Sequence, residues 1–358
     1  MSALPRDSRP SGPQRPLPIA VTMGDPEGIG LDITLMSWHA RVRHELPPFL
    51  FYGDADALHQ RAHRLGLAAP IAQVHSASEA MAAFATALPV RALAGGPHAS
   101  PKTGSGAVLA AIEEATAAVA GGEALALLTN PATKAALTRP HLGPHLKYPG
   151  HTQLLAILAS RHYPGKVFHP VMMLAADELK VVPTTVHIPL SEVPAALTRE
   201  LLVATMRIVA ASLTTDFGIA APRLAVCGLN PHAGEDGLIG REEAAVIGPA
   251  IAELAAEGVL VSGPFPADTL FHAEARGSYD VAIAMYHDQA LIPIKTLAFD
   301  RAVNVTLGLP FVRTSPDHGT AFARAGTGSA RPDSFLAALR LAGVLGRRRA
   351  ACSAPFSP

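Results

Sequence analysis

Short apolar runs alternate along this chain with longer segments in which apolar residues recur at helical spacing. The apolar runs predict strands at 18–23, 49–52, 124–128, 170–174, 181–188, 224–227 and 281–285. The helical spacing predicts helices at 105–120, 152–160, 191–213, 241–257 and 334–344. Strands that are apolar throughout are typical of sheets covered on both faces. Their alternation with helices favours an α/β fold with a mainly parallel sheet.

Composition narrows the class of protein. With 358 residues, of which 49% are hydrophobic, the chain is long enough for two domains and too apolar to be disordered. Lys plus Arg and Asp plus Glu both number 29, which gives no support for a nucleic-acid or membrane-surface protein. No apolar run reaches the roughly 18–20 residues that span a bilayer.

The two ends of the chain differ in composition from the rest. Residues 1–16 are rich in Pro, Ser and Arg and contain no apolar core of a secretory signal. We therefore expect a disordered tail at 1–16, a frayed end at 348–358 and a cytoplasmic protein.

Histidine is the abundant candidate metal ligand. The chain has 16 histidines but only two cysteines, Cys227 and Cys352, which are too far apart for a thiolate zinc motif. His187, His232 and His287 each lie at or just after the end of a predicted strand, where sites gather in open α/β sheets. Three imidazoles there form a plausible divalent-metal site. The alternative is that each ring bonds a nearby carbonyl.

A second group of residues suits an anion. His151 and Thr152 open a predicted helix, where free backbone N–H groups attract negative charge, although Thr152 is equally an ordinary N-cap residue. Lys295, Asn304 and Arg313 lie in an otherwise apolar stretch. Such cations fit a phosphate or carboxylate pocket, or simply extend to the surface.

Glycine-rich segments do not form a known nucleotide or nucleophile motif. The segments at 28–30, 104–106 and 326–328 fail the GxGxxG pattern, and no Walker A or GxSxG motif occurs. A classical Rossmann site is not expected.

Several long motifs together resemble the 4-hydroxythreonine-4-phosphate dehydrogenase (PdxA) family of pyridoxal phosphate (vitamin B6) biosynthesis. The resemblance runs from about residue 18 to about residue 346 and rests on TMGDPEGIG (22–30), PGHTQLLA (149–156), VMMLAADELKVVPTTVHIPL (171–190), GLNPHAGEDGLIGREE (228–243), GPFPADTLF (263–271), AMYHDQALIPIK (284–295) and VNVTLGLPFVRTSPDHGTAF (303–322).

The resemblance implies a two-domain fold like that of isocitrate and isopropylmalate dehydrogenases, with mainly parallel sheets and an interdomain cleft. One domain would comprise 17–128 and 296–347, and the other, dimer-forming domain 129–295. A homodimer is implied, with a Zn, Mg or Co ion shared near its interface. The family's metal ligands fall on His187, His232 and His287, and its substrate contacts on His151, Thr152, Lys295, Asn304 and Arg313.

The implied reaction is the NAD- or NADP-dependent oxidation of 4-phosphooxy-L-threonine to 2-amino-3-oxo-4-phosphooxybutanoate. This β-keto acid then loses carbon dioxide to give 3-amino-2-oxopropyl phosphate. Asp288 and Lys295 are the two candidates for the general base. Alternatives are a paralogue that oxidises threonate or erythronate 4-phosphate or an aromatic-acid cis-dihydrodiol, and an acyltransferase of related fold.

Overall fold

The computed structural model describes residues 16–93, 105–137 and 150–352. The expected N-terminal tail lies almost wholly outside the described residues. The described strands are β1 (Ile19–Thr22), β2 (Phe49–Tyr52), β3 (Ile71–Gln73), β4 (Leu88–Arg91), β5 (Leu127–Thr129), β6 (Val171–Ala175), β7 (Lys180–Pro183), β8 (Arg223–Cys227), β9 (Leu260–Phe265), β10 (Val281–Ala284), β11 (Val303–Leu307) and β12 (Arg313–Pro316).

The α-helices follow the strands along most of the chain. They are α1 (Gly30–His39), α2 (Ala55–Leu65), α3 (Ala77–Ala83), α4 (Ser105–Ala120), α5 (Lys134–Leu137), α6 (His151–His162), α7 (Val193–Ala196), α8 (Arg199–Thr215), α9 (Gly248–Ala256), α10 (Ala267–Leu270), α11 (Ala273–Arg276), α12 (His287–Ala298) and α13 (Asp333–Ala351).

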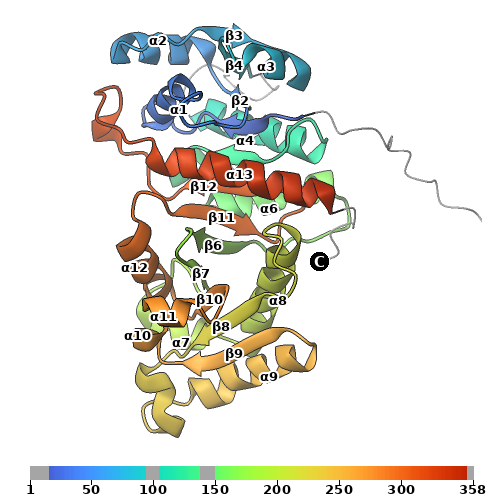
Figure 1. Cartoon of the computed structure of the whole chain (residues 1–358), viewed down its shortest axis with the longest axis vertical. Coiled ribbons are helices and arrows are strands. Elements are labelled where there is room, and N and C mark those ends of the chain that lie inside the picture. Colours follow the sequence, from blue (N-terminus) through green and yellow to red (C-terminus); the bar gives the residue numbers. More distant parts are fainter. Residues whose placement is uncertain (1–15, 94–104, 138–149, 353–358) are drawn as a thin grey trace, which may run out of the picture.

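All the described strands belong to one sheet, in the order β3-β4-β2-β1-β5-β12-β11-β6-β7-β10-β8-β9. The molecule is elongated, with β3 toward one end and β9 toward the other (Figure 1). Most neighbouring strands are parallel, which confirms the predicted α/β class. The antiparallel pairs are β12–β11, β11–β6 and β6–β7.

These antiparallel pairs divide the sheet into two parallel blocks. The first block runs from β3 to β12, and the second contains β7, β10, β8 and β9. Because three antiparallel pairings separate the blocks, their strands point in opposite directions. The carboxyl ends of the strands in one block therefore lie on the same side of the sheet as the amino ends of the strands in the other. A site shared by the two blocks needs an element that runs along the strand direction from one side to the other.

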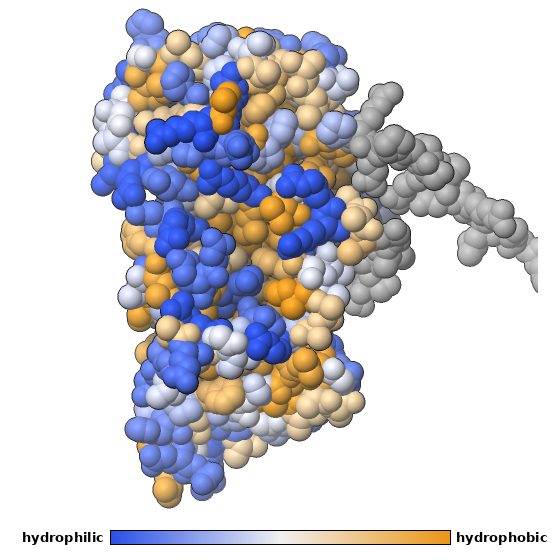
Figure 2. Space-filling view, in the orientation of Figure 1, coloured by the Kyte–Doolittle hydropathy of each residue, from blue (hydrophilic) through white to orange (hydrophobic). Residues whose placement is uncertain are grey.

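Apolar side chains cover both faces of the sheet. In the second block, Ala290, Leu291 and Ile294 of α12 pack on one face, and Leu202, Met206 and Val209 of α8 belong to the main core. Covering both faces explains why the strands are apolar throughout. Figure 2 shows hydrophilic and apolar residues interspersed on the face in view.

Three of the predicted helices differ in extent from those in the structure. The helix expected at 191–213 is interrupted, because Leu197 is extended and Thr198 caps a new helix through its side chain. The helix expected at 241–257 begins with a π-helical turn at Glu243–Ile247. The C-terminal helix is longer than expected and runs to Ala351, so residues 348–351 are helical rather than frayed.

Within the part of the chain that the structure describes, no helix has the length and apolar character needed to cross a membrane. Both cysteines are free; Cys227 is buried and Cys352 is exposed.

Candidate active site

Arg313 is the buried cation of the site. It opens β12 and is only 4% exposed. Its Nε and Nη2 donate to Thr129 Oγ1 at 3.1 and 2.5 Å, and its Nη1 donates to Thr306 Oγ1 at 2.9 Å. Burial lowers the pKa of the guanidinium to about 10, so it stays charged at neutral pH. Since a guanidinium has five N–H groups, the two hydroxyls fix its plane and leave N–H groups for an anion.

His151 lies near Arg313 at the start of α6. The N-cap residue of this helix is Gly150, with no side-chain cap bond, so Thr152 is not the N-cap residue. The ring atom Nε2 of His151 is buried without a hydrogen-bond partner among the described residues. Burial, and then the Arg313 charge, lower the pKa of His151 to about 3, which keeps the ring neutral. A neutral ring and free helix N–H groups suit an anionic ligand.

Asn304 joins this group through the sheet. It lies in β11 opposite Ser315 of β12, and its buried Oδ1 also lacks a hydrogen-bond partner among the described residues. An unsatisfied buried acceptor is costly unless a ligand or water donates to it. The substrate contacts predicted at His151, Asn304 and Arg313 thus each retain unused hydrogen-bonding capacity.

His187 and His287 face each other, with ring centroids 5.6 Å apart. Neither closes a strand as expected. β7 ends at Pro183, and His187 has a φ of 54°, a left-handed backbone angle that is incompatible with an extended strand. His287 is the first residue of α12. Desolvation, then His287 and Lys134, lower the pKa of His187, which favours the neutral imidazole that binds metals.

Asp288 orients His287 rather than reaching freely into the site. Its Oδ1 lies 2.7 Å from His287 Nδ1, and the carboxylate side chain is 69% exposed. A carboxylate on Nδ1 fixes the ring so that Nε2 is the free acceptor, as in many metal-bound histidines.

His232 does not join the other two histidines. It lies in a turn, Pro231–Gly237, in which five successive residues have left-handed backbone angles, and its side chain is 65% exposed. Among the described residues, no group of three His, Cys, Asp or Glu side chains within this chain is placed to hold a metal ion. The expected convergence of three histidines is therefore not found within one chain, because the turn leaves His232 on the surface.

Lys295 connects the two parts of the site. It lies two turns beyond His287 on α12, and its Nζ is 3.1 Å from Oδ2 of Asp317, just after β12. The exposed side of α12 borders a groove of about 480 Å³, lined by His287, Asp288, Leu291, Ile292, Lys295, Thr296 and Phe299.

Three residues of the site were missed by sequence reasoning. Thr129 and Thr306 are ordinary strand residues, and nothing in the sequence marks them as partners of Arg313. Asp317 is different, because it is the first residue after β12 (Arg313–Pro316). Its place at a strand's carboxyl end was the available signal.

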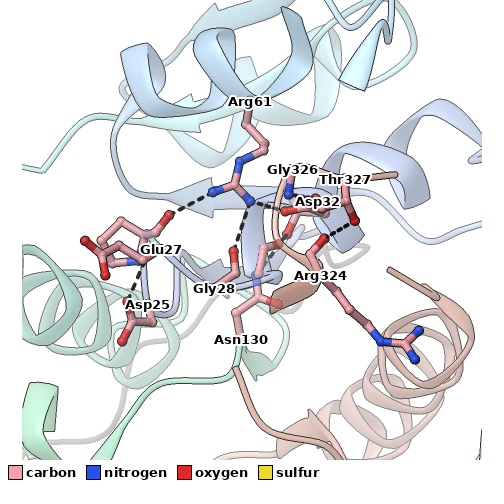
Figure 3. Close-up of polar contacts among 12 residues, drawn as sticks. Asp25, Glu27, Gly28, Asp32, Arg61, Asn130, Arg324, Gly326 and Thr327 are labelled. Carbon is pink, nitrogen blue, oxygen red and sulfur yellow. Dashed lines mark hydrogen bonds and ion pairs between the residues drawn. The ribbon is translucent and has the colours of Figure 1, made fainter. Parts of the chain in front are cut away.

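A buried ion pair supports the turn between β1 and α1 (Figure 3). Asp32 is fully buried, pairs with Arg61 and accepts a hydrogen bond from Gly326 N at 2.7 Å. Arg61 also donates to the carbonyls of Gly28 at 3.0 Å and Pro26 at 3.1 Å. This network ties α2 and the segment at Gly326 to the turn that carries the TMGDPEGIG motif.

Comparison with known proteins agrees with the motifs. The family model described as "Pyridoxal phosphate biosynthetic protein PdxA" matches residues 45–342. A 4-hydroxythreonine-4-phosphate dehydrogenase of Methylorubrum populi is 52% identical over 345 residues, which cover 95% of this chain and 97% of the relative.

Solved structures give the same result. The crystal structure of 4-hydroxythreonine-4-phosphate dehydrogenase from Klebsiella pneumoniae matches with a TM-score of 0.77 and 36% identity, covering 92% of this chain and 98% of that one. A terephthalate 1,2-cis-dihydrodiol dehydrogenase from Burkholderia xenovorans matches with a TM-score of 0.59 and 26% identity, covering 92% and 98%. These relatives are oxidoreductases, and the chain belongs to the PdxA family of pyridoxal phosphate biosynthetic proteins.

Proposed function

We propose that this protein oxidises 4-phosphooxy-L-threonine with NAD or NADP and a divalent metal ion, in the biosynthesis of pyridoxal 5′-phosphate in the cytoplasm. The product, 2-amino-3-oxo-4-phosphooxybutanoate, would lose carbon dioxide to give 3-amino-2-oxopropyl phosphate. The observation that carries this choice of substrate is the buried, hydroxyl-fixed guanidinium of Arg313 beside the start of α6. The names of the relatives support the same substrate.

The anion site is built for a phosphate or a carboxylate. Removing a cation such as Arg313 from water costs free energy, and the binding of an anion beside it offsets that cost. Free N–H groups at the start of α6 add donors without adding another charge. Of the other expected contacts, Thr152 is the second residue of α6 and Asn304 offers its unused Oδ1.

The metal site fits this chain in part. His187 and His287 are close, and the pKa of His187 is lowered, so both suit a divalent ion. When bound, Zn, Mg or Co would polarise the substrate hydroxyl as a Lewis acid. Asp288 would keep the His287 ring in one orientation, and Lys295 would lie beside the site.

The third metal ligand requires a second copy of the chain. We propose that His232, exposed on its turn, completes the metal site of the partner subunit in a homodimer. Large apolar side chains are exposed shortly after His187, at the end of the His232 turn and along α12, and they support an interface between subunits: Leu190, Leu238, Ile292 and Phe299. We further propose that 17–128 with 296–347 and 129–295 are the two domains that meet at this site.

The rival within the family is oxidation of a cis-dihydrodiol, favoured by the likeness to the terephthalate diol enzyme. The purified protein should be incubated with NAD or NADP, a divalent ion and a panel of substrates, with absorbance followed at 340 nm. We expect the fastest turnover with 4-phosphooxy-L-threonine, and its loss on chelation with recovery when metal is restored. Faster oxidation of an unphosphorylated diol, or of a four-carbon sugar-acid phosphate, would contradict the proposed substrate.

A further inference from the structure

The ion pair between Lys295 and Asp317 joins elements from the two blocks of the sheet. Lys295 Nζ lies 3.1 Å from Asp317 Oδ2, and the two side chains are 34% and 12% exposed. α12 starts at the carboxyl end of β10 in the second block, and Asp317 follows the carboxyl end of β12 in the first. The eight residues from His287 to Lys295 advance α12 by about 12 Å, which brings the lysine to Asp317.

Asp317 is held more firmly than Lys295. Its backbone N–H donates to Ser334 Oγ at 3.1 Å, and that hydroxyl donates to the carbonyl of Ala302 at 3.1 Å. Ser334 is buried at the start of α13. The lysine has a flexible side chain and borders the groove along α12. The backbone of Asp317 is therefore anchored, and the flexible lysine side chain extends to its carboxylate.

Asp317 also has the properties of a proton acceptor. Its Oδ2 is buried and lies 3.1 Å from Lys295 Nζ, within reach of a proton on that nitrogen. Burial raises its pKa above the usual aspartate range, although Lys295, His318 and His287 act in the opposite direction. These three groups are the charged or titratable neighbours that act on it, while α13 contributes only the Ser334 hydroxyl. A carboxylate of raised pKa accepts protons more readily near neutral pH.

We propose that Asp317 is a positioning residue that fixes Lys295 and receives, through it, the proton released in the oxidation. The Lys295 ammonium first gives an N–H proton to Asp317 Oδ2 and becomes a neutral amine. As the substrate's C–H hydride passes to the nicotinamide, the hydroxyl proton then passes to the free electron pair on Lys295 Nζ. Lysine is an ammonium before and after, Asp317 becomes neutral, and the alcohol becomes a ketone, so atoms and charge balance.

This inference rests on the proposed oxidation and selects between the two candidate bases. Asp288 already contacts the Nδ1 atom of His287 and is mostly exposed, so it serves the histidine. Lys295 contacts the buried carboxylate of Asp317 and also lines the groove along α12.

The test compares Asp317→Asn, Asp317→Glu and the control Asp300→Asn. Asp300 is paired with Arg331 on the surface, outside the site. We expect Asp317→Asn to lower kcat about 100-fold, in the range of general acid–base catalysis, with KM changed less than about threefold. The acid limb of the pH profile should disappear. Asp317→Glu should restore that limb, and Asp300→Asn should behave as wild type.

A double-mutant cycle with Lys295→Met decides whether Asp317 acts through the lysine. In the Lys295→Met background, Asp317→Asn should cost less than about threefold, because the relay is already broken. If Asp317→Asn lowers kcat as much in the Lys295→Met background as in the wild type, the proposal is wrong. An unchanged kcat in Asp317→Asn alone would also overturn it. If Asp317→Asn does not fold, Lys295→Met alone must lose the acid limb, and its retention would overturn the proposal. A wild type inactive on every alcohol would instead contradict the proposed function.

Discussion

At the scale of the residue, the anion site depends on Arg313 and on the hydroxyls of Thr129 and Thr306, which hold its guanidinium in place. The sequence makes Arg313 a candidate for anion binding, because a cation in an apolar stretch either lines an anion pocket or extends to the surface. Its burial against Thr129 and Thr306 follows from the pairing of β12 with β5 and β11, which no local pattern reveals. Likewise, the unused Nε2 of His151 is a consequence of packing. Chemistry-bearing residues are visible in sequence, whereas their partners depend on strand register.

Arg313 should contribute to phosphate binding rather than to the oxidation itself. We expect Arg313→Ala to lower kcat/KM for the phosphorylated substrate by about 10- to 150-fold, roughly 1.4–3 kcal/mol, since charge-assisted hydrogen bonds are lost. With free 4-hydroxythreonine the loss should be small. Steady-state kinetics on both substrates check this, with exposed Arg331→Ala as control. An equal penalty on both substrates would assign Arg313 to the carboxylate instead.

His151 should make the protein sensitive to acid. Its folded-state pKa of about 3 lies below the unfolded value of about 6.5. Between these values the unfolded chain binds a proton that the folded chain does not, so stability falls as pH falls. We expect a loss of about 2 kcal/mol between about pH 7 and about pH 5 from this group. Urea unfolding of His151→Gln should lack that component, whereas the variant at exposed His162, His162→Gln, should keep it.

At the scale of the element, apolar strands were predicted well and turns were not. Strands β2 and β8 and helix α4 follow directly from their apolar patterns. The left-handed residues His187 and His232 lie outside regular structure, and their backbone angles have no periodic signal. The helix that starts at His287 was missed because its polar first turn follows the strand directly.

The C-terminal helix α13 is fastened to the end of α8. Arg349 pairs with Asp216, which is only 2% exposed, and donates to the Leu309 carbonyl at 3.0 Å. Arg348 donates to the carbonyl of Phe217. These bonds explain why the arginine-rich end remains helical.

Removing Arg349 would leave the Asp216 carboxylate buried without this partner. We expect Arg349→Ala to lower the free energy of unfolding by about 3–5 kcal/mol, as is typical of a broken buried ion pair. Arg347→Ala, at an exposed position of the same helix, should change it by less than about 0.5 kcal/mol. Adding Asp216→Asn to Arg349→Ala should restore part of the loss. Urea denaturation followed by circular dichroism measures all three, and equal stability of the two arginine variants would contradict this role.

At the scale of the whole molecule, the fold class could be predicted but the arrangement of the blocks could not. Alternating apolar strands and helices indicate a parallel sheet, yet the reversal between β12 and β7 depends on three antiparallel pairings. The three histidines follow β7, β8 and β10, which are parallel strands of one block, so this reversal does not separate them. The left-handed turn at Pro231–Gly237 does, because it leaves His232 on the surface while His187 and His287 face each other.

Two variants that are each inactive alone should restore activity when they form mixed dimers. If His232 completes the partner's site, His232→Ala and His287→Ala each destroy every site in their own homodimers. A mixed dimer has one intact site, with His187 and His287 from the first variant and His232 from the second. After unfolding and refolding an equal mixture, half the dimers are mixed and each has one of two sites, so about a quarter of wild-type activity should return. His187→Ala mixed with His287→Ala is the matched control and should recover nothing, because these two ligands come from the same chain. No recovery in the first mixture, from protein shown by light scattering to be dimeric, would place all three histidines in one subunit.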